Sequence, residues 1–327
     1  PEFPISVTFE FVYGDNQARV EQWIRSRKEI SLANLQKLAF TSSIKLPESI
    51  AETDLSFDVG DMGETTVSLC TNEDVQRNIW NICANGDRPV RLQIETQQRQ
   101  FSDWKFSDIM ELYNLSNDTY QALESFQCGI TEISDEVRPT FNYLVEEIMA
   151  SIKAFRTVNG SSEANRSEFI SRILSCVTAQ FDGRFELHPQ MEVAGESGRG
   201  PVDWVIKHED GRIIGVIEAK KSELNQGVAQ NIIQLRSSME SNKPKKLDRE
   251  ETPSTVFGIV TTAEAWIVLK MERTGRVHKV YVHEGAPYVI DLSKNVDPKN
   301  LAAGLEEVFI RLLWIYEQSL PAKGKEL

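Results

Sequence analysis

The sequence predicts an α+β protein of several domains: a small domain at residues 1–98, a helical connector at 99–158 and an α/β sandwich at 159–327. Three observations support this division. Strand and helix patterns in the order ββαββαβ fill the first part, and two long helical patterns without strands follow. A helix, three strands, another helix and further strands make up the rest, an order typical of a sheet covered by helices.

The composition is that of an ordinary folded protein, with 40% hydrophobic and 26% charged residues. No run of about 18 apolar residues is present, so we expect no membrane-spanning segment. The net charge of −13 argues against a protein that coats nucleic acid non-specifically. Residues 161–327, however, carry 24 acidic and 22 basic side chains, so this part is close to neutral and the charge argument is weaker there, although it still applies.

The cysteines show no spacing typical of a metal site or a disulfide framework. They are Cys70, Cys83, Cys128 and Cys176. We therefore expect free thiols in a reducing compartment inside the cell, which includes the nucleus. The chain opens with Pro1-Glu2-Phe3 and no initiator Met, so removal of a targeting segment from a secreted protein stays open.

The N-terminal domain begins with alternating apolar side chains from Ile5 to Phe11, the period of a half-buried strand. Ser31 is expected to cap the first helix and Asn72 the second. The predicted strands span residues 5–11, 18–24, 54–57, 65–70 and 90–94.

Acidic side chains gather after the third strand and at the start of the second helix: Asp58, Asp61, Glu64, Glu73 and Asp74. Acids at such places are commonly solvated, and a helix dipole favours them in the first turn. The run from Phe57 to Glu64, followed by Asn72 to Val75, also resembles the acidic motif of PB1 interaction domains, which have a ubiquitin-like β-grasp fold. That resemblance implies a protein partner with a basic face, bound through these acids. Both interpretations stay open.

The connector and the C-terminal domain are predicted from their hydrophobic periods. Asp135 is expected to cap a helix that has Pro139 in its first turn, and the apolar stripe of this helix predicts a packing surface. The predicted helices span residues 104–126, 135–155, 165–181, 227–239 and 301–320. The predicted strands span residues 188–194, 201–207, 212–219, 255–261, 265–271, 277–282 and 289–292.

A β-hairpin is the strongest local prediction in the C-terminal domain. The turn dipeptide Asp210-Gly211 lies between the apolar runs 201–207 and 212–219, which is the best short-range hairpin signal. If these two residues form the loop, Glu209 lies opposite Arg212. The register of every later pair follows from that one.

In this register Asp203 lies opposite Glu218, and Lys220 shares their face of the sheet because strand side chains alternate. Like charges directly opposite one another destabilise a sheet. A divalent metal ion between the carboxylates would remove the conflict. The alternative is a surface salt bridge from Lys220 to one of the two acids, worth at most about 1 kcal/mol.

The same residues resemble a known site motif. Pro201-Val202-Asp203, followed by Glu218-Ala219-Lys220, matches the PD-(D/E)xK nuclease superfamily, whose core has the same helix–strand–hairpin–helix order. Three segments resemble more closely the nuclease-like C-terminal domains of Crinkler-type effectors: Gly198–Asp203, Glu218–Lys221 and Gln226–Asn231. The resemblance covers about residues 160–290 and implies a restriction-endonuclease-like sandwich.

This resemblance implies an endonuclease that hydrolyses phosphodiester bonds with Mg²⁺ or Mn²⁺, with DNA as substrate in preference to RNA. Asp203 and Glu218 supply the hard oxygen ligands that Mg²⁺ prefers. Lys220 would orient or deprotonate the nucleophile and stabilise developing charge.

Further candidates surround the motif. Glu168 is a candidate third metal ligand; alternatively it completes a capping box with Asn165 and pairs with Arg172. Gln230, in the ladder of Gln226, Gln230 and Gln234, is a catalytic candidate for contact with a water or a phosphate, or else lies on a solvated face. The candidate phosphate-binding cations are Arg199, Lys221, Lys243, Lys245 and Lys246, unless these are only solvated.

Two functions follow from the sequence. The first is a metal-dependent nuclease with an N-terminal interaction domain, favoured by the trio of Asp203, Glu218 and Lys220. The second is a catalytically silent protein that combines the acidic PB1-like module with a nuclease-like fold and binds nucleic acid or a partner without cutting. The acidic net charge favours the second function.

Overall fold

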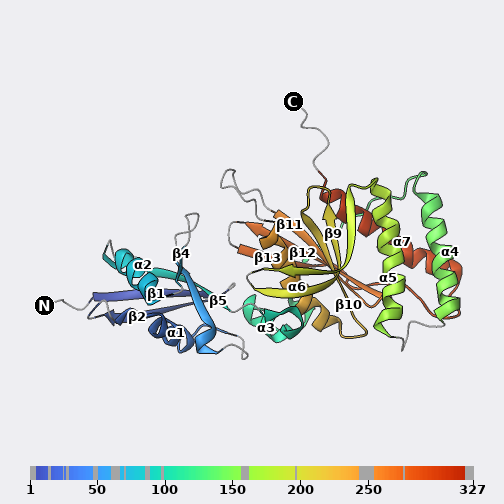
Figure 1. Ribbon diagram of the computed structural model, residues 1–327. Coiled ribbons are helices and arrows are strands. Elements are labelled where there is room, and N and C mark those ends of the chain that lie inside the picture. The colour runs from blue at the N-terminus through green and yellow to red at the C-terminus, as the bar shows by residue number, and fades with distance from the viewer. Residues whose placement is uncertain are drawn as a thin grey trace. The chain divides into compact units, whose positions relative to one another are not determined.

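A computed structural model describes residues 5–13, 16–24, 26, 29–46, 51–59, 67–69, 71–84, 89–96, 99–155, 162–195, 197–242, 254–274 and 277–320 (Figure 1). The chain divides into two compact units, and each is described by itself. The first unit comprises Pro1–Asp118 and Gly275–Val277, and the second comprises Thr119–Thr274 and His278–Leu327. The segment predicted as a connector is therefore shared between the two units.

The first unit contains a mixed sheet with the strand order β2-β1-β5-β3-β4. β1 pairs antiparallel with β2 and parallel with β5. The predicted order ββαββαβ is present, while the closer likeness to ubiquitin stays a prediction. The elements are β1 (Ile5–Tyr13), β2 (Asn16–Ile24), α1 (Leu32–Phe40), β3 (Leu55–Val59), β4 (Val67–Leu69), α2 (Asn72–Ala84), β5 (Val90–Thr96), β6 (Arg99–Gln100) and α3 (Phe106–Leu112).

Side-chain caps begin both larger helices of this unit. Ser31 caps α1 as predicted, because its hydroxyl accepts a hydrogen bond from Asn34 N at 3.2 Å. The cap of α2 is Thr71 and not Asn72: Thr71 Oγ1 accepts from Asp74 N at 3.2 Å, and Asp74 Oδ2 accepts from Thr71 N at 3.0 Å. This reciprocal pair is a capping box. The side chain of Asn72 instead accepts a bond from Leu32 N at 2.9 Å.

The single helix predicted over 104–126 is wrong. Only α3 is α-helical there, and it is followed by a 3₁₀ turn at Tyr120–Ala122 and by β7 (Glu124–Phe126). Asn114 has a left-handed backbone with a φ of 50° shortly after α3 ends. The Ser, Asn and Asp residues that follow compete with helical hydrogen bonds, so turns replace the helix.

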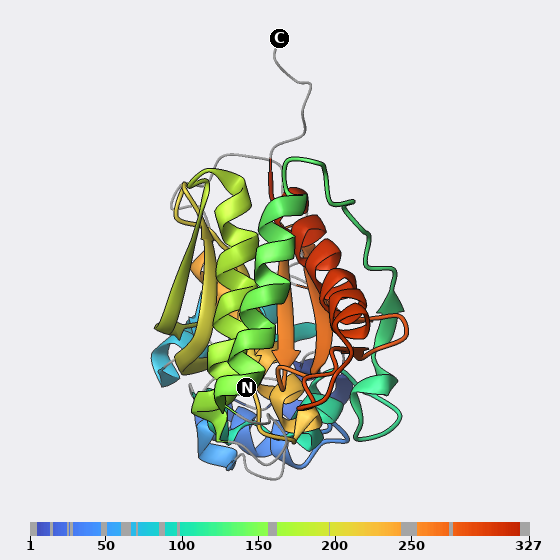
Figure 2. The ribbon, with the colours of Figure 1, turned by 90° about the vertical axis from the view of Figure 1, so that its right-hand side faces the viewer.

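The second unit is a sheet covered by helices on both faces. β9 (Gly198–His208), β10 (Ile213–Ala219), β11 (Ser254–Thr261), β12 (Ala265–Thr274), β13 (Val277–His283) and β7 are neighbours in this order, while β8 (Phe185–Ala194) pairs with β9 and β14 (Tyr288–Val289) with β12. Figure 2 shows α4 (Arg138–Phe155), α5 (Glu163–Thr178) and α7 (Pro298–Gln318) side by side over one face. α6 (Leu224–Ser241) contacts the other face. The predicted order of a helix, three strands and a helix is present, with helices on both faces.

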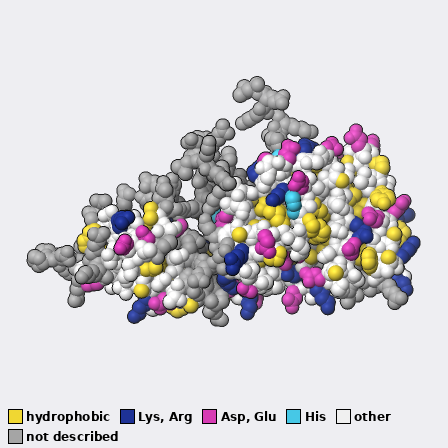
Figure 3. All heavy atoms as spheres, in the orientation of Figure 1, with side chains coloured by type: hydrophobic (Ala, Val, Ile, Leu, Met, Phe, Trp, Pro, Cys, Tyr) yellow, Lys and Arg dark blue, Asp and Glu magenta, His cyan; other side chains and the backbone are white. Residues whose placement is uncertain are grey.

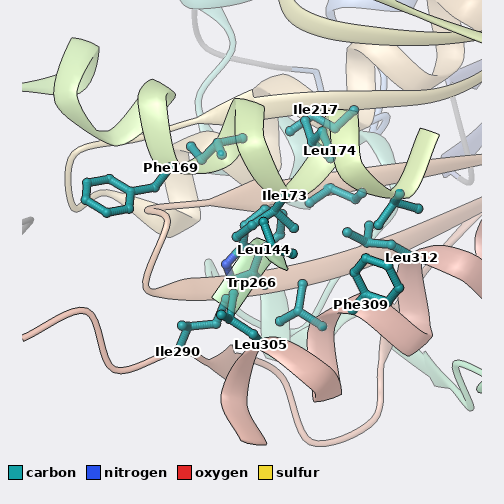
Figure 4. Packing of buried hydrophobic residues seen from close by; sticks show 14 of the residues in the cluster. Leu144, Phe169, Ile173, Leu174, Ile217, Trp266, Ile290, Leu305, Phe309 and Leu312 are labelled. Atoms are coloured by element: carbon teal, nitrogen blue, oxygen red, sulfur yellow. The ribbon is translucent and has the colours of Figure 1, made fainter. Parts of the chain in front are cut away.

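An apolar core fills the space between the sheet and the three helices. Leu144, Ile173 and Phe309 from the helices meet Ile217 and Trp266 from the sheet, and all five are buried (Figure 4). Burial of each large aliphatic or aromatic side chain contributes roughly 1.5–3 kcal/mol. Because side chains alternate along a strand, the residue after Ile217 points to the opposite face, toward α6.

A glycine allows α6 to approach the sheet closely. A Cβ atom on Gly227 would lie 2.6 Å from Val260 Cγ1 and 2.8 Å from Lys220 Cγ. Only a residue without a side chain fits between these neighbours. Gly227 therefore sets the position of the first turn of α6 over the ends of β10 and β11.

We expect Gly227→Ala to lower the free energy of unfolding by about 1–3 kcal/mol, because the added methyl group overpacks this contact. Urea unfolding of the intact chain measures the change. Ser222→Ala, at an exposed position just before α6, is the control and should leave stability unchanged. A Gly227→Ala variant as stable as wild type would show that α6 can shift freely.

Candidate metal centre

The hairpin between β9 and β10 has a different loop from the predicted one, but the predicted register at the site. His208 N donates to Arg212 O at 2.9 Å, so the loop consists of Glu209, Asp210 and Gly211. Gly211 takes the left-handed position, with a φ of 86°. Glu209 therefore does not pair with Arg212. Sequence cannot distinguish these loops, since an Asp-Gly dipeptide suits both.

A β-bulge then restores the predicted pairing. Ile213 pairs with Lys207, the register shifts between Ile213 and Gly215, and from Gly215 onward the pairs are those expected from a two-residue loop. Ile217 pairs with Trp204. One residue further along, Asp203 on β9 lies opposite Glu218 on β10.

The Asp203 carboxylate is held from both sides. Its Oδ2 accepts a hydrogen bond from Ala219 N at 2.8 Å, and its Oδ1 accepts one from Gln190 Nε2 at 2.8 Å. The side chain is half-buried. These two bonds fix its orientation between β10 and β8.

The Glu218 carboxylate is buried and bound by a cation and an amide. Lys220 Nζ lies 2.7 Å from Glu218 Oε1, and Gln234 Nε2 donates to Glu218 Oε2 at 2.6 Å. The Glu218 side chain is 8% exposed and that of Lys220 is 20% exposed. Lys220 is itself anchored, because its backbone N–H donates to Thr261 O at 2.8 Å. The predicted trio thus lies where the C-terminal end of β10 runs beside the middle of β9.

The pKa of Glu218 is raised above its ordinary value. Desolvation by burial is the largest cause, and the charge of Asp203 raises the pKa further. Lys220 and the hydrogen bond from Gln234 oppose both effects. A buried carboxylate beside a second one is a place where a cation is favoured.

The glutamine of α6 that contacts the site is Gln234, whereas Gln230 was the predicted candidate. Gln230 is buried, but among the described residues no hydrogen bond joins it to the carboxylates. Gln234, one turn later, is the residue that contacts Glu218, and Asn231 Nδ2 in turn donates to Gln234 Oε1 at 3.1 Å. Period alone favoured none of the three glutamines. Gln190, on β8, was missed because nothing in its sequence context marks it.

Glu168 does not join the two carboxylates. It lies on α5, where its Oε2 pairs with Arg172 Nη1 at 2.9 Å. The cap of α5 is Ser162, whose hydroxyl accepts from Asn165 N at 3.3 Å, so the alternative capping box from Asn165 to Glu168 is also wrong. Across the described part of the chain, no group of three His, Cys, Asp or Glu side chains could hold a metal ion.

The candidate phosphate-binding cations divide into two groups. Arg199, on β9, and Lys221, just after β10, are exposed and near the ends of the strands that hold the trio. The other three lie outside the described residues: Lys243, Lys245 and Lys246.

Two of the three described acids of the PB1-like motif have hydrogen-bond partners within the chain. Asp58 Oδ1 accepts a hydrogen bond from Ser68 Oγ at 2.6 Å, and Asp74 belongs to the capping box of α2. Glu73 is exposed in the first turn of α2. Asp61 and Glu64 lie outside the described residues.

The residues of the site fit a hard divalent cation with few protein ligands. Two carboxylates from adjacent strands suit Mg²⁺, which commonly binds through one or two carboxylates and keeps several waters. The two carboxylates are close, because Asp203 Oδ2 accepts a hydrogen bond at 2.8 Å from the backbone N–H of Ala219, the residue after Glu218. A cation between them would relieve the repulsion of like charges, and Lys220, whose Nζ lies 2.7 Å from Glu218 Oε1, partly fills that role.

Comparison with known proteins gives a relationship over nearly the whole chain. No family model matches the sequence. Crinkler effector protein 1 of Rhizophagus irregularis is 27% identical over 330 residues, which is 96% of this chain and 66% of that protein. The chain is therefore similar to a Crinkler effector over nearly its whole length. Crinkler effector protein 5 of Phytophthora infestans is 29% identical over 125 residues, 38% of this chain and 33% of that protein.

The chain thus spans about two thirds of the length of the first relative and one third of the length of the second. Among solved structures, the type IIG restriction endonuclease BpuSI is similar over 46% of this chain and 16% of that one, with 16% identity and a TM-score of 0.33. A likeness this weak carries no argument about fold or activity. None of the helices in the described part of the chain has the length and apolar character needed to cross a bilayer.

The raised pKa of Glu218 predicts how its substitution changes the pH dependence of stability. Between its ordinary pKa of 4.5 and the raised folded value, the folded state binds more protons than the unfolded state, so stability falls as pH rises. Glu218→Gln removes this component. We therefore expect the unfolding free energy of Glu218→Gln, relative to wild type, to increase with pH across this interval and then level off.

Urea unfolding in metal-free buffer from pH 4 to pH 8 measures this difference. Glu168→Gln is the matched control, because Glu168 lies in an exposed ion pair and should show no comparable trend. A relative stability of Glu218→Gln that falls as pH rises would contradict the raised pKa.

Proposed function

We propose that the second unit of the chain is a Mg²⁺- or Mn²⁺-dependent endonuclease of the PD-(D/E)xK type that hydrolyses phosphodiester bonds of DNA. One observation carries the proposal. Asp203 and Glu218 occupy adjacent positions on β9 and β10, and Lys220 Nζ lies 2.7 Å from Glu218 Oε1. A carboxylate pair with a lysine is the arrangement that the PD-(D/E)xK motif implies.

Each residue of the trio has a chemical role in this proposal. Asp203 and Glu218 would hold the cation, which supplies an acidified water and neutralises charge on the phosphate. Asp203 is suited to the task because hydrogen bonds to Ala219 N and Gln190 fix its side chain. Lys220 would position the attacking water and stabilise the charge that develops on the phosphate oxygens.

The distribution of surface charge favours binding of nucleic acid through a few phosphate contacts near the site over binding through a broad basic surface. On the face shown in Figure 3, the described basic and acidic side chains are interspersed and form no broad basic field. Arg199, four residues before Asp203 on β9, and Lys221, which follows Lys220, are exposed and could contact phosphates flanking the cleaved bond. The proposed preference for DNA over RNA rests on the resemblance of the sequence motif around Asp203, Glu218 and Lys220 to the PD-(D/E)xK nuclease superfamily.

The named relatives are effectors, and we propose an effector role for this chain as well, with the nucleus as a site of action. We also retain a protein partner for the first unit, bound through Asp58, Glu73 and the neighbouring acids of the PB1-like motif. The in-chain partners of Asp58 and Asp74 weigh toward a structural role for those two side chains.

The cleavage prediction concerns the full chain incubated with Mg²⁺ or Mn²⁺ and single- or double-stranded DNA or RNA. We expect wild type to cut DNA, and Asp203→Ala and Lys220→Ala each to reduce the rate by at least about 100-fold, since both groups act in the chemical step. Glu168→Ala is the matched control and should retain activity. Gel analysis of labelled substrates measures the rate.

Cleavage that survives both substitutions would reject the assignment of the site. Metal binding without cleavage of any substrate would favour the second function, a protein that binds nucleic acid or a partner without cutting.

Lys220 and the metal ion should compete for Glu218 in this site. Lys220→Met keeps most of the side-chain volume but removes the cation that now pairs with Glu218 Oε1. We expect this variant to bind Mn²⁺ as tightly as wild type or more tightly, although cleavage is lost. Calorimetric titration measures the affinity, and markedly weaker binding by Lys220→Met would show that Lys220 does not occupy the cation position.

A further inference from the structure

Gln190 stands out among the strand residues because its backbone is left-handed. Its φ is 49°, in a conformation that L-residues other than Asn and Asp seldom adopt. It lies inside β8, where Pro189 pairs with Trp204 and Met191 pairs with Val202. The same pairing continues on both sides, so no inserted residue explains the unusual backbone.

The residue directly opposite Gln190 is Asp203, the central residue of the site. Gln190 Nε2 donates to Asp203 Oδ1 at 2.8 Å. A carboxylate can only accept, so the amide group must present its nitrogen to Asp203. The strained backbone and the hydrogen bond occur at the same place, and strain that persists beside a functional group commonly serves its geometry.

We propose that Gln190 is a positioning residue that holds Asp203 in the orientation needed to bind a divalent cation. The other carboxylate oxygen is held by Ala219 N at 2.8 Å, so the side-chain bond and the backbone bond together leave Asp203 one orientation. Partners of this kind orient metal ligands, and their loss commonly weakens metal binding by about 10- to 100-fold. The inference rests on the proposed metal site.

Substitution by glycine distinguishes the effect of the Gln190 side chain from the effect of its left-handed backbone. Gly adopts a positive φ without strain, so Gln190→Gly removes the amide and preserves the backbone. Asp182→Gly is the matched control: Asp182 is exposed, has a φ of 50° and lies outside the site. Both variants relieve left-handed backbone, and only one removes a contact to Asp203.

The experiment is a calorimetric titration of the full chain with Mn²⁺, together with thermal unfolding in metal-free buffer. We expect Gln190→Gly to bind Mn²⁺ at least about tenfold more weakly than wild type, with a melting temperature no lower. Asp182→Gly should bind as wild type does. Gln190→Asn, whose side chain tolerates the backbone but is one methylene shorter, should also bind more weakly.

Wild-type affinity in Gln190→Gly and Gln190→Asn, with binding lost in Asp203→Ala, would overturn the positioning role and leave the metal site intact. Wild-type affinity in Asp203→Ala, or no binding by wild type, would overturn the metal site itself. A lower affinity in Asp182→Gly equal to that of Gln190→Gly would attribute the effect to the backbone and reject the role of the amide.

Discussion

The site depends on the electrostatic repulsion between two carboxylates that are held side by side in a sheet. Asp203 and Glu218 carry like charges, and the burial of Glu218 makes its ionised form costly, so its pKa is raised. The chain keeps both groups in place with hydrogen bonds and with a lysine 2.7 Å from Glu218. We propose that a bound cation stabilises this arrangement by neutralising the two like charges.

The surrounding fold holds the two carboxylates close together. The apolar core on one face fixes β10 through residues such as Ile217, and alternation directs Glu218 to the other face. There α6 lies close to the sheet because Gly227 has no side chain, which brings Gln234 to 2.6 Å from Glu218. β8 supplies Gln190 to Asp203 from the remaining side. β8, β10 and α6 therefore all supply hydrogen bonds to the two carboxylates.

Sequence reasoning predicted the order of elements and the trio, because both depend on local periods and on a hairpin signal. The predicted two-residue loop is wrong, although the pairing of Asp203 with Glu218 that was derived from it is present. The three-residue loop shifts the register by one residue, and the bulge before Gly215 shifts it back. Every residue of β10 is buried, so its continuous apolar run has no alternation in which the bulge could be recognised. Gln190 and Gln234 were not singled out because their roles arise from contacts between distant segments. The prediction of one helix over residues 104–126 was wrong because turn-forming residues follow α3 and outweigh the helical pattern.

The most direct test of the central claim is the position of Mn²⁺ in a crystal of the intact chain, located by its anomalous scattering. The account predicts one peak between the carboxylates of Asp203 and Glu218, with the amine of Lys220 displaced from Glu218 Oε1. A well-ordered site with no peak at millimolar Mn²⁺, or a peak that lacks both carboxylates, would contradict it.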